Sequence, residues 1–249
     1  MKATFNLAKA SSSIVQAALL QDPRKAEIES YIDENVPKAR AEHLIDVAQQ
    51  AEILGKESGL SKTARIPLYW GGIFHDIARE FNNKKLEAEA DKFGIEMIEA
   101  DRKVPYYLHG RVGAAIAEQV FNFTDRAVLD GPRFHTPGIG PKDPGISRSG
   151  LLVTIADKQV ESRSQRVRKR IGKIYQHYGH NMRGDMFAAL YVFLKKLERE
   201  QSEQPLVHPY TERTIEWLEQ QLGLNTGTWK SLSITDKKDK IVEGKASKA

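Results

Sequence analysis

The stretch GGIFHDIARE, residues 71–80, sets two ionisable side chains directly behind a run of apolar residues. His75 is of a residue type that commonly binds metal ions, and Asp76 is of the type that often accompanies it there. An aspartate is almost never fully buried unless it is paired or bound to a metal. These two groups therefore need partners from elsewhere in the chain.

The surrounding chain has the apolar spacing of helices. In ARAEHLIDVAQQAEIL, residues 39–54, apolar side chains recur at the spacing that forms one face of a helix. Alternation typical of strands is scarce, so we expect an all-α fold. The segments that read as helices are 39–54, 64–81, 110–121, 149–160, 185–200 and 211–222.

We expect one all-α domain over residues 23–223, built as a helical bundle. Residues 1–22 would form an N-terminal extension. Residues 224–249 are polar and rich in lysine, and we expect this tail to be disordered.

Composition narrows the partners and the location. The chain has 249 residues, a net charge of +5 and a pI of about 9.2, which favours an anionic partner such as a nucleotide, a phosphate ester or nucleic acid. No apolar run approaches the roughly 20 residues of a membrane span. The chain has no cysteine, which excludes disulfides, thiolate metal sites and cysteine nucleophiles. This composition fits a reducing compartment, and we expect a cytoplasmic protein.

Four histidines and two aspartates lie at or beside apolar helical segments. A single histidine on an apolar face is usually a hydrogen-bonded core residue, but one or two such groups on each successive helix favour a common site. Imidazole and carboxylate suit iron, manganese, zinc and similar divalent ions, and bundle cores can host sites built this way. The six residues are His43, His75, Asp76, His109, His135 and Asp157.

Neighbouring residues on a helix diverge by about 100°. His75 and Asp76 can therefore flank one ion, or Asp76 can lie between two ions and bridge them. A two-metal site holds a hydroxide at neutral pH and clamps a phosphoryl oxygen, which predicts a phosphoester or phosphoanhydride hydrolase.

The order of these residues resembles the signature of the HD phosphohydrolase superfamily. FHDIARE resembles the family's LHDxAK segment, and YYLHGRVGAAIAEQVF (106–121) resembles the LLHGPVGAYLA segment of one branch. RFHTPG (133–138) and TIADKQVESR (154–163) resemble that branch's RYHTTG and LADKIEPxR. The branch is the YqeK type, whose members cut diadenosine tetraphosphate symmetrically into two ADP.

The resemblance implies an HD-domain helical bundle with additional C-terminal helices and a pair of divalent ions. Iron is the metal most strongly implied, with manganese, cobalt and zinc as alternatives. One ion would be held by His43, His75, Asp76 and Asp157, and the other by Asp76, His109 and His135, with Asp76 as the bridge.

The implied reaction is attack on phosphorus by a metal-bridging hydroxide. Asp76 and Arg79 would be the catalytic residues. Arg79, Arg111 and Arg163 would bind the substrate phosphates.

Some segments depart from the family pattern or lie outside it. DRAVLDGPRFHT contains Gly131-Pro132, and because proline in a helix interior costs about 3 kcal/mol, we expect the helix to break before Pro132 and to resume or loop into His135. The segment RSQRVRKRIGK, 163–173, is either a solvated helix face or a phosphate-binding rim. The loop after His135 is a candidate lid, and His208, before Pro209, reads as a loop residue.

Two alternatives stay open. The first is another HD nucleotide phosphohydrolase, acting on an alarmone, a deoxynucleoside triphosphate or a cyclic dinucleotide; the GYP motif of the cyclic-di-GMP branch is absent. The second is a non-catalytic protein that binds a nucleotide or nucleic acid. The expected partner is a nucleotide substrate, nucleic acid is not favoured, and a homodimer is left open.

Overall fold

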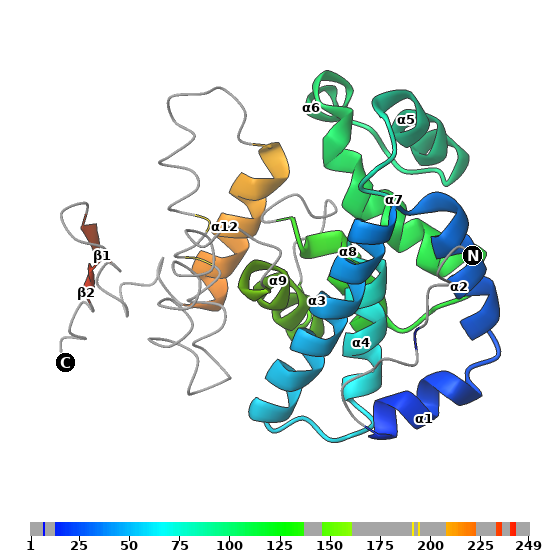
Figure 1. The fold of residues 1–249 in the computed structure, drawn as a ribbon. Coiled ribbons are helices and arrows are strands. Elements are labelled where there is room, and N and C mark those ends of the chain that lie inside the picture. Colours follow the sequence, from blue (N-terminus) through cyan, green and yellow to red (C-terminus); the bar gives the residue numbers. More distant parts are fainter. Residues whose placement is uncertain are drawn as a thin grey trace.

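The structure is a computed structural model that describes residues 7, 13–136, 146–160, 191, 194, 208–222, 233–235 and 240–242. Its helices form a bundle in which α3 lies against α4 and α9, while α8 packs against α4, α7 and α9 (Figure 1). The α-helices are α1 (Ser13–Gln21), α2 (Lys25–Asn35), α3 (Lys38–Glu57), α4 (Arg65–Phe74), α5 (Asn83–Lys92), α6 (Glu99–Lys103), α7 (His109–Ala115), α8 (Arg126–Phe134), α9 (Arg148–Gln159) and α12 (Pro209–Gln221).

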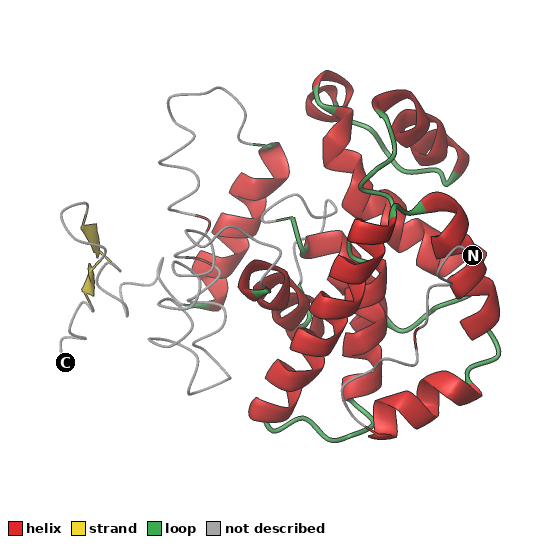
Figure 2. Ribbon diagram, in the orientation of Figure 1, coloured by secondary structure: helices red, strands yellow, loops and turns green. Residues whose placement is uncertain are grey.

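Two short helical segments flank α7. The 3-10 helix η2 (Pro105–Leu108) leads into α7, and the π-helix η3 (Ile116–Val120) follows it. An antiparallel hairpin of β1 (Ser233–Thr235) and β2 (Lys240–Val242) pairs Ile234 with Ile241, within the predicted tail. Apart from this hairpin, the described elements are helical (Figure 2), which confirms the all-α prediction.

The core has two parts. The larger one gathers around the aromatic side chains Trp70, Phe74 and Phe123, whose rings lie 5.1–6.1 Å apart. It includes residues of the predicted N-terminal extension, 1–22, because Leu7, Val15 and Leu19 are fully buried. The smaller part joins α12 to α3 and α9 through Val47, Leu151, Leu152, Ile215 and Leu218.

Glycines let the central helices approach closely. A Cβ at Gly72 would lie 2.4 Å from Cα of Ala48 on α3, and one at Gly131 would lie 2.8 Å from Cα of Gly71. The contact at Gly72 brings α3 close to the end of α4, where His75 lies. The contact at Gly131 brings α8 against α4.

The helix expected over 64–81 is shorter than predicted. It ends at Phe74, and residues 75–80 form turns whose backbone bonds span three residues, such as Arg79 N to Asp76 O at 3.0 Å. Nδ1 of His75 lies 2.6 Å from the carbonyl oxygen of Gly72, which would accept from the amide of Asp76 if the α-helix continued. The His75 side chain thus bonds to a carbonyl group that the backbone of a longer α4 would use.

The predicted break before Pro132 is wrong. Helix α8 runs through Pro132 to Phe134, and His135 continues it with an amide bond to Gly131 O at 3.1 Å. The helix ends within one turn of Pro132, so the missing N–H removes one bond, to the carbonyl of Val128. Packing of Gly131 against α4 and the Asp125 side-chain cap at the N-terminus offset that loss.

Helix α12 agrees with the predicted helix over 211–222. His208 lies just before α12, outside regular secondary structure as predicted, and it is the N-cap of the helix. Unlike a typical loop residue, it is buried, with an exposure of 2%. The predicted helix over 185–200 lies outside the described residues except for Tyr191 and Leu194. No helix among the described residues is both long and apolar enough to cross a membrane.

Candidate metal centre

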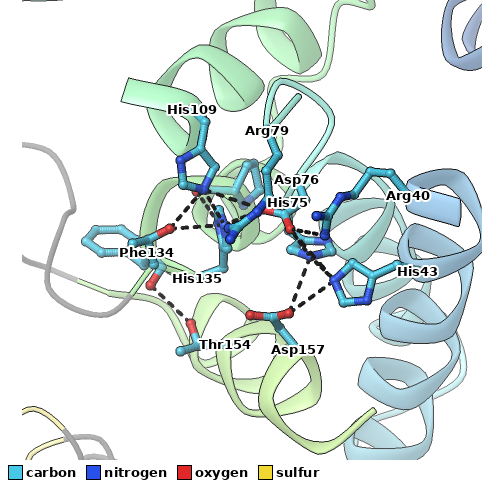
Figure 3. Close-up of polar contacts among 12 residues, drawn as sticks. Arg40, His43, His75, Asp76, Arg79, His109, Phe134, His135, Thr154 and Asp157 are labelled. Carbon is cyan, nitrogen blue, oxygen red and sulfur yellow. Dashed lines mark hydrogen bonds and ion pairs between the residues drawn. The ribbon is translucent and has the colours of Figure 1, made fainter. Parts of the chain in front are cut away.

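Five separate segments bring the six predicted ligand residues to one place in the bundle (Figure 3). Five of the side chains are fully buried and His43 is 4% exposed. Their donor atoms form two groups, each of which could hold a metal ion. The first subsite is His43, His75 and Asp157, and the second subsite is Asp76, His109 and His135.

The first subsite joins α3, the end of α4 and α9. Nε2 of His43 lies 3.2 Å from Nε2 of His75 and 3.3 Å from Oδ1 of Asp157. Nε2 of His75 lies 3.7 Å from the same carboxylate oxygen. The three donor atoms therefore face one point between the helices.

The second subsite joins the start of α7, the end of α8 and the turn after His75. Nε2 of His109 and Nε2 of His135 lie 3.1 Å apart. Oδ1 of Asp76 is 2.9 Å from the His135 nitrogen and 3.4 Å from the His109 nitrogen. The hydroxyl of Thr136 lies 3.1 Å from both nitrogens.

Asp76, a member of the second subsite, also faces the first one. While Oδ1 faces the second subsite, Oδ2 lies 3.5 Å from Nε2 of His75 and 3.7 Å from Nε2 of His43. One carboxylate thus offers a separate oxygen to each subsite, which is the arrangement required of a bridging ligand.

The backbone fixes which histidine nitrogen faces the site. Nδ1 of His75, His109 and His135 each lies 2.6–2.8 Å from a carbonyl oxygen three residues earlier. A carbonyl accepts only, so Nδ1 of each ring carries a hydrogen, and in the neutral form that binds metal the lone pair of Nε2 faces inward. At His109 and His135 two such lone pairs face each other, a contact that a cation relieves.

The donor spacing fits a divalent ion. Ligand atoms about 2.0–2.2 Å from one ion lie about 2.9–3.5 Å from each other at ordinary coordination angles. The nitrogen–nitrogen separations of 3.1 and 3.2 Å fall in that range. Imidazole and carboxylate donors suit iron, manganese, cobalt and zinc.

Burial and neighbouring charges set the protonation of the site. Burial alone raises the pKa of Asp76, but the charge of His75 and hydrogen bonds from the surrounding histidines hold that pKa well below its usual value. Burial lowers the pKa of His135 to about 3. Both groups are therefore in the deprotonated form that metal binding requires.

Two arginines reach the bridging carboxylate (Figure 3). Nη1 of Arg40 lies 3.0 Å from Oδ2 of Asp76, and Nη1 of Arg79 lies 3.4 Å from Oδ1. Both side chains are 22% exposed, so they connect the buried site with the surface. The Arg79 guanidinium also lies over the ring of Tyr106, 5.0 Å from its centre.

Arg40 is a residue that the sequence reasoning missed. It lies three residues before His43 on α3, and this spacing places two side chains on one helix face. That spacing was the available signal. The sequence reasoning also missed Lys158, whose ammonium group donates to Oδ2 of Asp157.

The structure does not bring Arg111 to the six ligands. Its guanidinium is 7% exposed and instead donates to the carboxylate of Asp101 and, at 3.0 Å, to the carbonyl of Glu96. His109 and Arg111 are two residues apart on α7, and a rotation of about 200° puts their side chains on nearly opposite sides of the helix. Arg163, the basic segment 163–173 and the loop over 137–145 lie outside the described residues.

Residues 40–159 match the family model of the HD domain. This stretch, just under half of the chain, is similar to the HD domain. All six residues of the two subsites fall inside the matched region, and so do Arg40 and Arg79.

Known proteins are similar over parts of the chain. The fold is similar to that of a solved structure described as a "predicted HD superfamily hydrolase involved in NAD metabolism" from Clostridium acetobutylicum, with a TM-score of 0.65 and 22% sequence identity. The similarity covers 78% of this chain and 96% of that one. At 22% sequence identity, this similarity shows a shared fold and nothing further.

Two curated relatives share parts of the sequence. The "Probable nicotinate-nucleotide adenylyltransferase/Ap4A hydrolase" of Mycoplasma genitalium is 27% identical over 180 residues, which cover 64% of this chain and 47% of that protein. The "Uncharacterized protein in pepC 5'region" of Lactococcus lactis subsp. cremoris is 29% identical over 87 residues, 35% of this chain and 43% of that protein. The chain thus spans less than half the length of either relative.

Proposed function

We propose that this HD-domain protein is a metal-dependent hydrolase of a nucleotide phosphoanhydride, and that its substrate is diadenosine tetraphosphate, cut symmetrically into two ADP. The observation that carries this proposal is the placement of Asp76 between two buried groups of ligands, with a guanidinium on each of its oxygens. Such a centre suits the displacement of one phosphate from another.

The six ligands would hold two divalent ions, with iron favoured from the resemblance. Bound at this position, such ions act as Lewis acids on a phosphoryl oxygen and lower the pKa of a water molecule. Asp76 would join the two subsites, and the backbone carbonyls bonded to Nδ1 would keep His75, His109 and His135 oriented.

Arg40 and Arg79 would bind the substrate. Once the charge of Asp76 is neutralised in the metal-bound protein, both guanidinium groups lose most of their attraction to it. Nη1 of each arginine then becomes available to the phosphate oxygens, while Nε and Nη2 of Arg40 stay bonded to Glu80 at 2.9 Å. A tetraphosphate carries several negative charges, so two arginines at the mouth of the site match it better than one phosphate ester.

The proposed reaction adds one water across the central phosphoanhydride bond. The oxygen of water forms a bond to one of the two inner phosphorus atoms, and the bridging oxygen leaves with the other half as ADP. Because ADP is itself a phosphate leaving group, it departs as an anion. The Mycoplasma relative, whose name includes Ap4A hydrolase, supports this choice of substrate.

The test is product chromatography on the purified chain with Mn²⁺ or Fe²⁺. The panel holds diadenosine tetraphosphate, an alarmone, deoxynucleoside triphosphates and cyclic dinucleotides. We expect ADP as the sole product from diadenosine tetraphosphate, at a higher rate than from the other compounds. Formation of ATP and AMP in equal amounts would contradict symmetrical cleavage. Absence of turnover for every compound would contradict the proposal that the protein is a hydrolase.

A further inference from the structure

A second buried charge cluster lies outside the metal centre. Asp101 on α6 is fully buried, and its carboxylate accepts from the guanidinium of Arg111, from Nε2 of His208 at 3.1 Å and from the amide of Ile98 at 3.0 Å. His208 lies 107 residues further along the chain, at the start of α12. The cluster therefore ties a C-terminal helix to the HD domain by a buried polar contact.

The contacts of His208 determine its tautomer. Nδ1 accepts from the amide of Tyr210 at 3.2 Å, which is the N-cap bond of α12. An amide only donates, so Nδ1 is unprotonated and Nε2 carries the hydrogen that goes to Asp101. The two nitrogens thus have separate tasks: one caps α12 and the other links α12 to Asp101.

The link leads directly to the second subsite. Asp101 is followed by η2, whose Tyr106 carbonyl lies 2.6 Å from Nδ1 of His109. The next residue, Tyr107, meets the His208 ring edge to face, with 5.4 Å between ring centres. Arg111, the other partner of Asp101, lies on α7, whose first residue is His109. His208 and Asp101 therefore hold η2 and the start of α7 from two sides.

The first subsite has no such link among the described residues. His43, His75 and Asp157 lie on α3, at the end of α4 and on α9, which pack directly against one another. His208 also lies beyond residues 40–159, the region matched by the HD domain model. The polar contact of His208 thus leads to the second subsite, whereas α12 meets α3 and α9, which carry His43 and Asp157, through apolar side chains.

We propose that His208 is a positioning residue for the second subsite: through its bond to Asp101, α12 fixes η2 and the start of α7, and so holds Nε2 of His109 toward His135. The inference rests on the proposed function in one respect, that the second subsite binds a metal ion. It concerns metal affinity rather than turnover.

Two substitutions separate the tasks of His208. In His208→Asn, the amide oxygen lies near the position of Nδ1 and keeps the cap, while the bond to Asp101 is lost. In His208→Gln, the amide nitrogen reaches the position of Nε2 and keeps the bond to Asp101, while the cap is lost. Each variant is thus the control for the other.

The experiment is calorimetric titration of the full-length chain with Mn²⁺ after removal of bound metal. His109→Ala, which keeps only the first subsite, identifies the binding step of the second. We expect His208→Asn to weaken the second step roughly tenfold, at the lower end of the effect of contacts that orient metal ligands, and to leave the first step unchanged. His208→Gln should bind both ions as the wild type does, with a melting temperature lowered by about 2–4 °C.

Three results would overturn the inference. The first is that binding of the second ion is unchanged in His208→Asn. The second is that binding of both ions weakens together, as it does when the fold is damaged. The third is that His208→Gln loses the second ion while His208→Asn keeps it. In each of these cases the wild type still binds two ions and the proposed function stands. A wild type that binds a single ion refutes the two-metal centre and this inference together.

Discussion

Oδ1 of Asp76 lies 2.9 Å from Nε2 of His135, although the two residues are 59 positions apart in the sequence. The contact exists because α8 continues through Pro132 and delivers His135 to the turn after α4. The other oxygen of the same carboxylate faces His43 and His75. The two candidate subsites therefore share the carboxylate of Asp76, and we expect their metal occupancies to depend on each other.

Asp76→Ala should abolish tight binding of both ions, because it removes the shared ligand. We expect metal affinity and turnover to fall by more than about a hundredfold, since even contacts behind the ligands contribute tenfold to a hundredfold. Metal analysis of the purified variant and an assay of ADP release measure the two effects. The control is Glu42→Gln, an exposed acid beside His43 that does not face the site. Wild-type activity in Asp76→Ala with metal still bound would refute the scheme.

Arg40→Ala should raise KM for the nucleotide by about tenfold to a hundredfold, because a hydrogen bond to a charged group contributes about 1.5–3 kcal/mol. Arg79→Ala should have a similar effect, and metal content should stay near the wild-type value in both. The control is Arg126→Ala, since this side chain is 64% exposed and paired with Asp130 on α8. An unchanged KM in both variants would show that Arg40 and Arg79 do not bind the substrate phosphates.

Asp101→Asn should lower the free energy of unfolding by about 2 kcal/mol near neutral pH, because the charged acceptor of Arg111 and His208 is lost. Burial alone raises the pKa of Asp101, but hydrogen bonds from His208 and Arg111 bring that pKa below 3.8. The carboxylate therefore stabilises the fold above the pKa of the unfolded chain, and this contribution is lost as the pH falls through the folded pKa.

Urea unfolding of both proteins over a range of pH checks this prediction. The difference between wild type and Asp101→Asn should be constant above about pH 5 and should shrink below the unperturbed value of 3.8. A difference that grows as the pH falls has the opposite sign and contradicts the assignment of Asp101 as a buried, ionised acceptor.

Gly72→Ala should separate α3 from α4, since the added Cβ would lie 2.4 Å from Cα of Ala48. Overpacking of this kind costs about 1–3 kcal/mol, which thermal unfolding can measure. It should also weaken the first subsite, because His43 lies on α3 and His75 directly follows α4, and these two helices move apart. The comparison is Gly94→Ala, which strains an exposed residue with φ of 67° and should leave metal affinity unchanged.

The sequence was sufficient to predict the helical class and the six residues that converge, because buried ionisable groups on successive apolar helices need one another. It did not predict the continuous helix that leads to His135. Local propensity argues for a break at Pro132, whereas packing of Gly131 on α4 keeps the helix intact. Tertiary contacts here outweigh an intrinsic cost of about 3 kcal/mol.

The arginines and His208 show a second limit of sequence reasoning. Arg111 follows His109 closely, yet a two-residue step on a helix turns it to Asp101. Arg40 lies on the correct face at a three-residue step, and helical spacing could have identified it. His208 could not be identified at all, because its partner Asp101 lies 107 residues away and no local pattern connects them.

The most direct test of the proposed dinuclear centre is a crystal structure of the Mn²⁺-loaded protein with the metal positions taken from anomalous scattering. We predict two peaks per chain, one among His43, His75 and Asp157 and the other beside His109 and His135, with one oxygen of Asp76 directed to each. A single peak, or two peaks of which one lacks contact with Asp76, would contradict the account.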